Sequence, residues 1–140
     1  MLVRCLYASR AIDGADDSVL ASILEQSRRN NLRCGITGLL IHANGVFVQV
    51  LEGGRAEVSR LLARLMRDDR HLDVTLLDFA EVTERGFANW TMGQVDLNSL
   101  NPALVLKYAP HARLDPFGMT GRASAMLLSD IAASGAIVQR

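Results

Sequence analysis

The sequence predicts an α+β protein with the ferredoxin-like order β-α-β-β-α-β-β and a C-terminal helical extension. Three observations support this fold class. An Asn-Gly pair separates two β-rich runs, which is the strongest short-range signal of a hairpin. A helical pattern of apolar residues lies on each side of this hairpin. Further β-rich runs open the chain and follow the second helix.

The first two elements are a short strand and a helix. Residues 2–8 are β-rich, and alternate side chains, Tyr7 among them, are expected to share one face. Helix N-terminal signals follow at residues 16–18, and the apolar residues after them recur at helical spacing. Gly35 is expected to end this helix.

The strand after the Asn-Gly turn carries an unusual glutamine. Phe47, Gln49 and Leu51 share one face, and three valines share the other. Because both faces are apolar, the strand is expected to be covered on both sides, with Gln49 in the core. A buried amide without partners costs roughly 1–3 kcal/mol. A side chain, a water or a ligand must therefore meet it.

The second half of the predicted sheet is less regular. An amphipathic helix is predicted over residues 56–71, a fourth strand over 73–82 and a fifth over 89–97. Trp90 and Met92 alternate on the fifth strand, so they are expected to point the same way.

The tail is expected to cover the sheet face that the two helices leave open, or to form a surface for a partner. Pro102 can open a short helix, and Asp115-Pro116 marks a break. A weak stripe predicts a last helix through Ala123, Met126, Leu127 and Ile131. We therefore expect one domain over residues 1–97 and a helical cap or output segment over 98–140.

Composition excludes several classes of protein. The formal net charge of zero argues against a dedicated nucleic-acid binder. No apolar run approaches the roughly 20 residues that a membrane span needs. Cys5 and Cys34 form no redox or metal motif, and the three histidines lack metal-ligand spacing, so a reduced cytoplasmic setting without a metal site is expected.

Several polar residues have both a structural and a functional interpretation. Tyr7 and Gln49 fall on neighbouring strands, where they would form a register-fixing polar pair or bind a ligand. Asn30 and Asn31 would cap the first helix or bond a planar heteroaromatic ligand. Trp90 and Met92 would pack in the core, or Met92 would contact a ring system.

Charged residues of the second helix allow a phosphate site. Arg60, Arg64 and Arg67 recur along it with Arg70 nearby, which indicates either a solvated face or bidentate phosphate binding. Asp68 would bond sugar hydroxyls or simply lie at an exposed helix end. The enzyme class that fits is a ferredoxin-like hydrolase of small acyl phosphates, and a regulatory or oligomerisation module is the third class.

Taken together, these features resemble the BLUF family of blue-light sensors that use FAD. The matching stretches are "LYAS", "RNNLRCGITGLLIHANGVFVQVLEG", "RDDRH" and "FANWTMG". They cover about residues 1–97, and the tail is similar to that of short stand-alone members.

The resemblance implies that FAD lies between the two helices. The photoactive residues would be Tyr7, Gln49, Trp90 and Met92. The cofactor-binding residues would be Tyr7, Asn30, Asn31, Gln49, Arg64, Asp68, Arg70 and Met92. Which of Trp90 and Met92 lies next to Gln49 stays open.

The resemblance also implies a photoreceptor without enzymatic activity of its own. Light would draw an electron and then a proton from Tyr7, and Gln49 would end rotated or tautomerised. Its stronger hydrogen bond to the flavin would shift absorption slightly to the red. The signal would pass to an unknown protein partner, with no nucleic acid or membrane involved, and an uncovered sheet face would make a homodimer reasonable.

Overall fold

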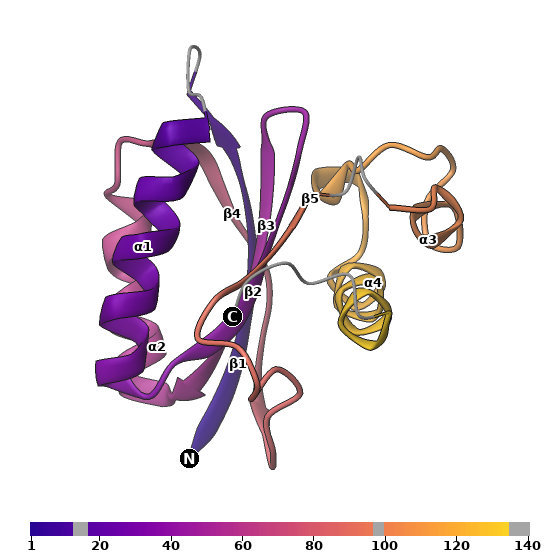
Figure 1. Cartoon of the computed structure of the whole chain (residues 1–140). Coiled ribbons are helices and arrows are strands. Elements are labelled where there is room, and N and C mark those ends of the chain that lie inside the picture. The colour runs from indigo at the N-terminus through magenta and orange to yellow at the C-terminus, as the bar shows by residue number, and fades with distance from the viewer. Residues whose placement is uncertain (13–16, 97–99, 135–140) are drawn as a thin grey trace.

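The computed structural model describes residues 1–12, 17–96 and 100–134, and its centre is a five-stranded sheet in the order β4-β1-β3-β2-β5 (Figure 1). The strands are β1 (Leu2–Ala11), β2 (Thr37–Ala43), β3 (Val46–Gly54), β4 (His71–Val82) and β5 (Gly93–Asp96). The β2–β5 pair is parallel and the other neighbouring pairs are antiparallel. The predicted ferredoxin-like order is confirmed.

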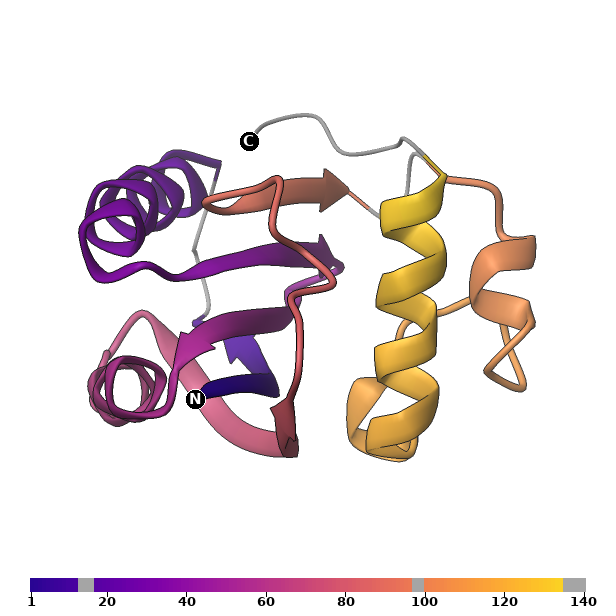
Figure 2. The same ribbon diagram turned by 90° about the horizontal axis from the view of Figure 1, so that it is seen from below.

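Two helices, α1 (Asp17–Cys34) and α2 (Arg55–Met66), lie on one face of the sheet (Figures 1 and 2). Gly35 has φ of 69° and ends α1, as predicted. The start signal at Asp16 lies outside the described residues. The predicted end of α2 at residue 71 is wrong, because the carboxylate of Asp68 caps the backbone N–H of Arg70 at 3.0 Å and turns the chain into β4.

The hairpin turn between β2 and β3 fixes the register of these two strands. Asn44 and Gly45 have φ of 52° and 78°, as a type I′ turn requires. In the neighbouring β1–β3 pair, Tyr7 lies directly opposite Gln49. The local turn therefore sets which β3 side chains face the helices.

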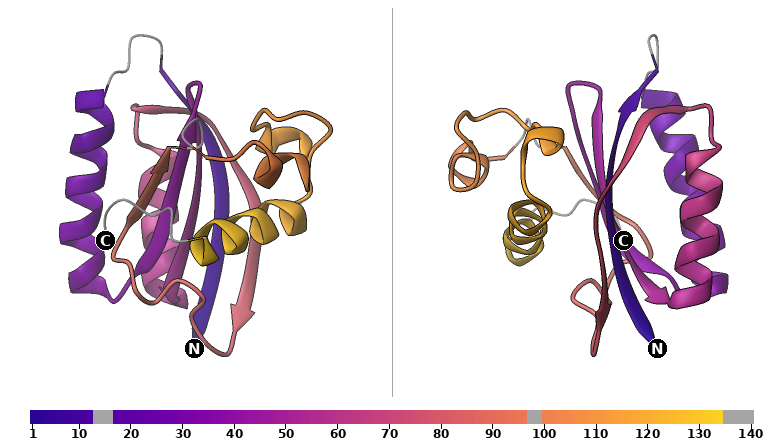
Figure 3. Two further views of the ribbon diagram at one scale, coloured as in Figure 1. Left: turned by 45° about the vertical axis from the view of Figure 1, so that its right-hand side comes forward. Right: turned by 180° about the vertical axis from the view of Figure 1, so that it is seen from behind.

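Short helices of the C-terminal segment cover the other face of the sheet (Figure 3). They are α3 (Ala103–Leu106), η2 (Pro116–Gly118) and α4 (Gly121–Ala133). Pro102 precedes α3, and the hydroxyl of Thr120 accepts from the N–H of Ala123 at 3.0 Å, which caps α4. The expected helical cover is confirmed.

One part of the predicted α4 stripe is wrong. Met126 is 46% exposed, whereas Ser124 and Leu128 are buried with Leu127 and Ile131. The helix is rotated so that 124, 127, 128 and 131 face the sheet. The predicted domain boundary at residues 97 and 98 lies outside the described residues and stays a prediction.

The sheet separates two apolar clusters. The cluster under α1 and α2 contains Val3, Cys5 and Leu51, and the cluster under α4 contains Leu6 and Val48. Among the described helices, none is long and apolar enough to cross a membrane. Both faces of β3 are buried, so Gln49 lies in the core as predicted.

Candidate functional site

Three side chains of the helix-covered face form a buried chain of contacts. The Tyr7 hydroxyl donates a hydrogen bond to Oε1 of Gln49, and Nε2 of Gln49 donates to the sulfur of Met92 at 3.1 Å. Tyr7, Gln49 and Met92 are exposed by 1%, 4% and 0%. The structure therefore gives the buried amide one partner on each side.

Burial holds Tyr7 in its neutral form. Desolvation raises the pKa of the Tyr7 phenol far above its ordinary value, and the charges of Cys5 and Asp68 raise it further. Desolvation also raises the pKa of the Cys5 thiol to about 12, with a smaller contribution from Asp78. The phenol can therefore act as a hydrogen-bond donor to Gln49 across the physiological pH range.

The β4–β5 loop (residues 83–92) joins α1 to this site. Nδ2 of Asn31, a side chain that is 1% exposed, donates to the carbonyl of Thr91 at 3.0 Å. Nε of Arg28 donates to the carbonyl of Met92 at 3.2 Å. The buried Nη2 of Arg28 has no hydrogen-bond partner among the described residues, and burial lowers the pKa of this guanidinium. An unpaired buried donor of this kind is costly unless a further acceptor meets it.

The structure places Met92, and not Trp90, next to Gln49. The predicted placement of both residues on a fifth strand is wrong. β5 begins only at Gly93, so Trp90 and Met92 lie in the β4–β5 loop rather than on a strand. Met92 packs in the cluster under α1 and α2, whereas Trp90 packs against the cluster under α4. They do not point the same way, because β2–β5 pairing starts at Leu39–Gly93 and strand alternation does not extend to residue 90.

Of the remaining sequence-predicted residues, Asp68 and Arg70 follow the end of α2, and the charge of Asp68 acts on the Tyr7 phenol. Asp68 and Arg70 form a forked ion pair at 2.6–3.1 Å, and this hydrogen bonding raises the pKa of Arg70. Nη2 of Arg70 also donates to Oε1 of Gln26 on α1 at 3.0 Å, so the pair ties the end of α2 to α1. Arg64 is exposed on α2, and Asn30 is half-buried beside Asn31.

Sequence reasoning missed two residues of this region, Arg28 and Glu52. Arg28 stands next to Arg29 in the sequence, and only its contact with the loop distinguishes the two. Glu52 is fully buried on the face opposite Gln49. Its signal was present in the sequence, since it continues the buried alternation of Val46, Val48 and Val50.

The comparisons place residues 2–93 in a family model described as sensors of blue-light using FAD. Among curated proteins, the beta subunit of the photoactivated adenylate cyclase of Euglena gracilis is 38% identical over 92 residues. That match covers 65% of this chain and 11% of the cyclase subunit. The chain thus spans about a tenth of the length of this relative.

Solved structures match over nearly the whole chain. The dark-state structure of BlrB, a BLUF protein, is 34% identical with a TM-score of 0.81, and the match covers 95% of this chain and 96% of BlrB. The photo-activated state of BlsA is 29% identical with a TM-score of 0.84, covering 93% and 94% of the two chains. The family model and these relatives indicate light sensing, and none of these findings supports the hydrolase alternative. The fold, the buried Tyr-Gln pair and these matches agree, and the chain belongs to the BLUF family of sensors of blue light using FAD.

Proposed function

We propose that this chain senses blue light by reversing the Gln49 amide between Tyr7 and FAD, and that it passes the change to a protein partner. The observation that carries the proposal is the buried chain Tyr7–Gln49–Met92. A primary amide between a phenol and a thioether has two settings of nearly equal shape and different hydrogen bonding.

The residues present fit FAD. Nη2 of Arg28 is buried without a partner among the described residues, and an acceptor oxygen of FAD would satisfy it. Asn31 and Gln49 are buried amides beside the β4–β5 loop that could bond the polar edge of the ring system. We propose that Arg64 and the Asp68–Arg70 pair lie toward the dinucleotide, with Asn30 near the ring.

The mechanism follows from the hydrogen-bond capacities of the residues. Bound FAD would supply blue-light absorption and an excited-state oxidant. Tyr7 would be the electron donor to that oxidant, and its hydroxyl proton would move toward Oε1 of Gln49, which already accepts a hydrogen bond from it. Once the electron and the proton had returned to Tyr7, Gln49 would be left reversed or tautomerised, and the Tyr7 hydroxyl would accept from the amide instead of donating to it.

The contact with Met92 favours the dark setting of the Gln49 amide over the reversed setting. In the structure, Nε2 of Gln49 donates to the Met92 sulfur, a weak acceptor. After reversal, Oε1 faces that sulfur, which has no hydrogen to donate. The reversed amide is therefore less well satisfied by the protein, which drives the return in darkness.

The output route that we propose runs through β5 to the C-terminal segment. Gly93 follows Met92 directly and starts β5, while Trp90 packs against the cluster under α4. Hydrogen exchange in dark and light tests this route. A light-induced difference in residues 90–96 and 100–134 is expected, and equal protection in both states would remove it.

We further propose that this chain is cytoplasmic and has no catalytic activity of its own, that its downstream partner is a protein, and that it binds neither nucleic acid nor membrane. Cys5 and Cys34 are free, which is typical of a reducing compartment. Among the described residues, no cluster of His, Cys, Asp or Glu could hold a metal ion. A homodimer is part of this proposal, since β4 is an edge strand with Leu72, Leu76 and Phe79 exposed by 38–50%.

Absorption spectroscopy of the purified chain tests the proposed function. Yellow protein whose flavin spectrum shifts to the red under blue light and recovers in darkness is the expected result. Colourless protein that stays colourless after incubation with FAD would reject it.

A further inference from the structure

A fully buried carboxylate lies on the sheet face opposite the Tyr7–Gln49 pair. Glu52 on β3 is 0% exposed and is the direct cross-strand partner of Arg4 on β1. Oε2 of Glu52 accepts from Nε of Arg4 at 2.8 Å and lies 2.7 Å from Nη2. A buried charge of this kind requires a partner and a full set of hydrogen bonds.

The remaining hydrogen bonds to Glu52 come from the β4–β5 loop. The backbone N–H of Gly86 donates to Oε2 at 2.9 Å, and that of Phe87 donates to Oε1 at 2.6 Å. A Cβ at Gly86 would lie 3.1 Å from Nη2 of Arg4, so the loop passes tightly over the guanidinium. Hydrogen bonds to an ionised acceptor are roughly twice as strong as neutral ones, so Glu52 anchors this loop.

The same loop ends at the photoactive pair. Five residues after Phe87, Met92 accepts from Gln49, and its carbonyl accepts from Arg28. Tyr7 and Gln49 are cross-strand partners three positions along the same β1–β3 pair from Arg4 and Glu52. One short loop is therefore held on one sheet face by Glu52 and on the other by Gln49.

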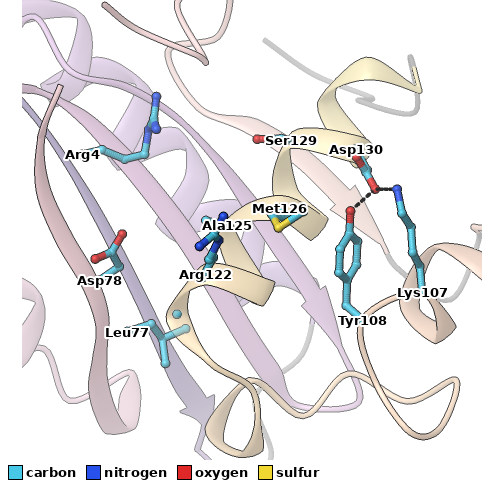
Figure 4. A pocket seen from close by; sticks show the side chains of 11 residues that line it. Arg4, Leu77, Asp78, Lys107, Tyr108, Arg122, Ala125, Met126, Ser129 and Asp130 are labelled. Carbon is cyan, nitrogen blue, oxygen red and sulfur yellow. Dashed lines mark hydrogen bonds and ion pairs between the residues drawn. The ribbon is translucent and has the colours of Figure 1, made fainter. Parts of the chain in front are cut away.

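Arg4 also lines a groove beside α4. A cavity of about 750 Å³ is lined by Arg4 and Asp78 from the sheet and by Arg122, Met126 and Ser129 from α4 (Figure 4). The Arg4 side chain is 31% exposed, and its guanidinium lies 5.9 Å from the centre of the Phe87 ring. Phe87 is buried in the cluster that contains Leu128 of α4. A shift of the loop would move groups that α4 contacts.

We infer that Arg4 and Glu52 are a positioning pair: they hold the β4–β5 loop so that Met92 meets Gln49, and they carry a light-driven shift of Met92 to the groove beside α4. The second half of this inference rests on the proposed function. It differs from the route through β5, because it crosses the sheet through the side chains of the β1–β3 pair rather than along the chain into the C-terminal segment.

The test compares E52Q, the double variant R4Q/E52Q and the wild-type chain by hydrogen exchange and absorption spectroscopy. In E52Q, a neutral amide replaces the carboxylate, so only one of its two terminal atoms can accept from the loop N–H groups. In the double variant, Arg4 is also replaced by a neutral side chain, so no charge is left without its partner. The matched control is E81Q, because Glu81 pairs with Arg55 on the surface, with both side chains more than half exposed.

Loss of the charged anchor is expected to speed amide exchange in residues 83–92 by about tenfold or more, with or without FAD. Both variants should retain FAD, change the dark-recovery time by at least about threefold and reduce the light-dependent exchange difference in residues 121–133 to the part that the route through β5 carries. E81Q should match the wild-type chain in each measurement.

Unchanged loop exchange in both variants overturns the inference. Faster loop exchange with a wild-type recovery time and a wild-type α4 difference also overturns it, because a merely structural anchor would behave in that way. A wild-type chain that binds no FAD rejects the proposed function and the light-dependent half with it, while the exchange measurement without flavin still decides whether Glu52 anchors the loop.

Discussion

Tyr7 and Gln49 are direct cross-strand partners on β1 and β3, and the phenol hydroxyl donates to the amide oxygen inside the helix-covered core. This relationship depends on two local features of the sequence. Strand alternation puts both side chains on one face, and the Asn44-Gly45 turn fixes the register of the β2–β3 hairpin that holds Gln49. The proposed photoactive pair is thus positioned by backbone pairing.

The first prediction concerns this pair. Tyr7→Phe or Gln49→Leu should retain FAD but lose the reversible red shift, because each removes one side of the amide switch. Tyr7→Phe should also lower the free energy of unfolding by about 1–3 kcal/mol, since Oε1 of Gln49 loses its donor. Absorption spectra in darkness and light, with denaturant unfolding, measure both effects.

Tyr108→Phe is the matched control for the loss of a phenol. Its hydroxyl bonds Asp130 on the α4 side of the sheet, away from the candidate site. The red shift should persist in this variant. A normal photocycle in Tyr7→Phe or Gln49→Leu would contradict the proposed roles.

The parts of the site that could be predicted from the sequence depend on short-range patterns. The hairpin, the common face of Tyr7 and Gln49 and the burial of Gln49 follow from a period of two and one turn dipeptide. The hairpin and the alternation are local signals, whereas the common face of Tyr7 and Gln49, which are 42 positions apart, also required the split βαβ strand order that makes β1 and β3 neighbours.

The other parts depend on contacts between distant segments. Trp90 and Met92 separate to opposite faces because their loop is held by Glu52, Asn31 and Arg28, which no local period encodes. The early end of α2 likewise depends on the Asp68 side chain bonding the backbone two residues later. Helical pattern alone favours continuing the helix through this turn.

The second prediction concerns Arg28. Replacing it with Met keeps the side-chain stem and removes both the buried Nη2 donor that has no partner among the described residues and the Nε donor to the Met92 carbonyl. If the Nη2 donor meets FAD, the affinity for FAD should fall by about 10- to 150-fold, the equivalent of one hydrogen bond to a charged group. Flavin fluorescence titration measures the dissociation constant.

The control is Arg29→Met, since Arg29 is the exposed neighbour on the same helix. Equal affinities for FAD in the two variants would exclude Arg28 from the cofactor site.

The third prediction concerns Met92. Met92→Leu keeps an apolar side chain of similar volume at this buried position and removes the sulfur that accepts from Gln49. In this variant the Gln49 N–H loses its acceptor at residue 92, so the dark setting of the amide is no longer favoured by this hydrogen bond. Recovery from the light state should therefore slow. Time-resolved absorption after a blue-light pulse measures the rate, and faster recovery in Met92→Leu would show that the sulfur does not favour the dark setting.

The fourth prediction is a pH dependence of stability caused by Cys5. Burial raises the pKa of its thiol from 9.0 to about 12, so between these values the unfolded chain loses a proton that the folded chain keeps. Folded stability should therefore be complete below pH 9.0 and fall above it by about 1.4 kcal/mol per pH unit from this group. Cys5→Ala should reduce that slope by the same amount, as measured by denaturant unfolding across the alkaline range. An unchanged slope would mean that another group titrates there.

The fifth prediction concerns the contact that holds α4 on the sheet. A Cβ at Gly121, the first residue of α4, would lie 2.2 Å from the carbonyl oxygen of Leu77 on β4, so Gly121→Ala must push the helix start away from the strand. Overpacking of this kind costs about 1–3 kcal/mol. Amide exchange in residues 121–133 should become faster, while the red shift should persist because the Tyr7–Gln49 pair lies on the opposite face.

Gly54→Ala is the matched control, since a Cβ at Gly54 would meet no atom within 4 Å and the φ of −63° there suits alanine. Wild-type protection of α4 in Gly121→Ala would show that the helix is not held by this contact.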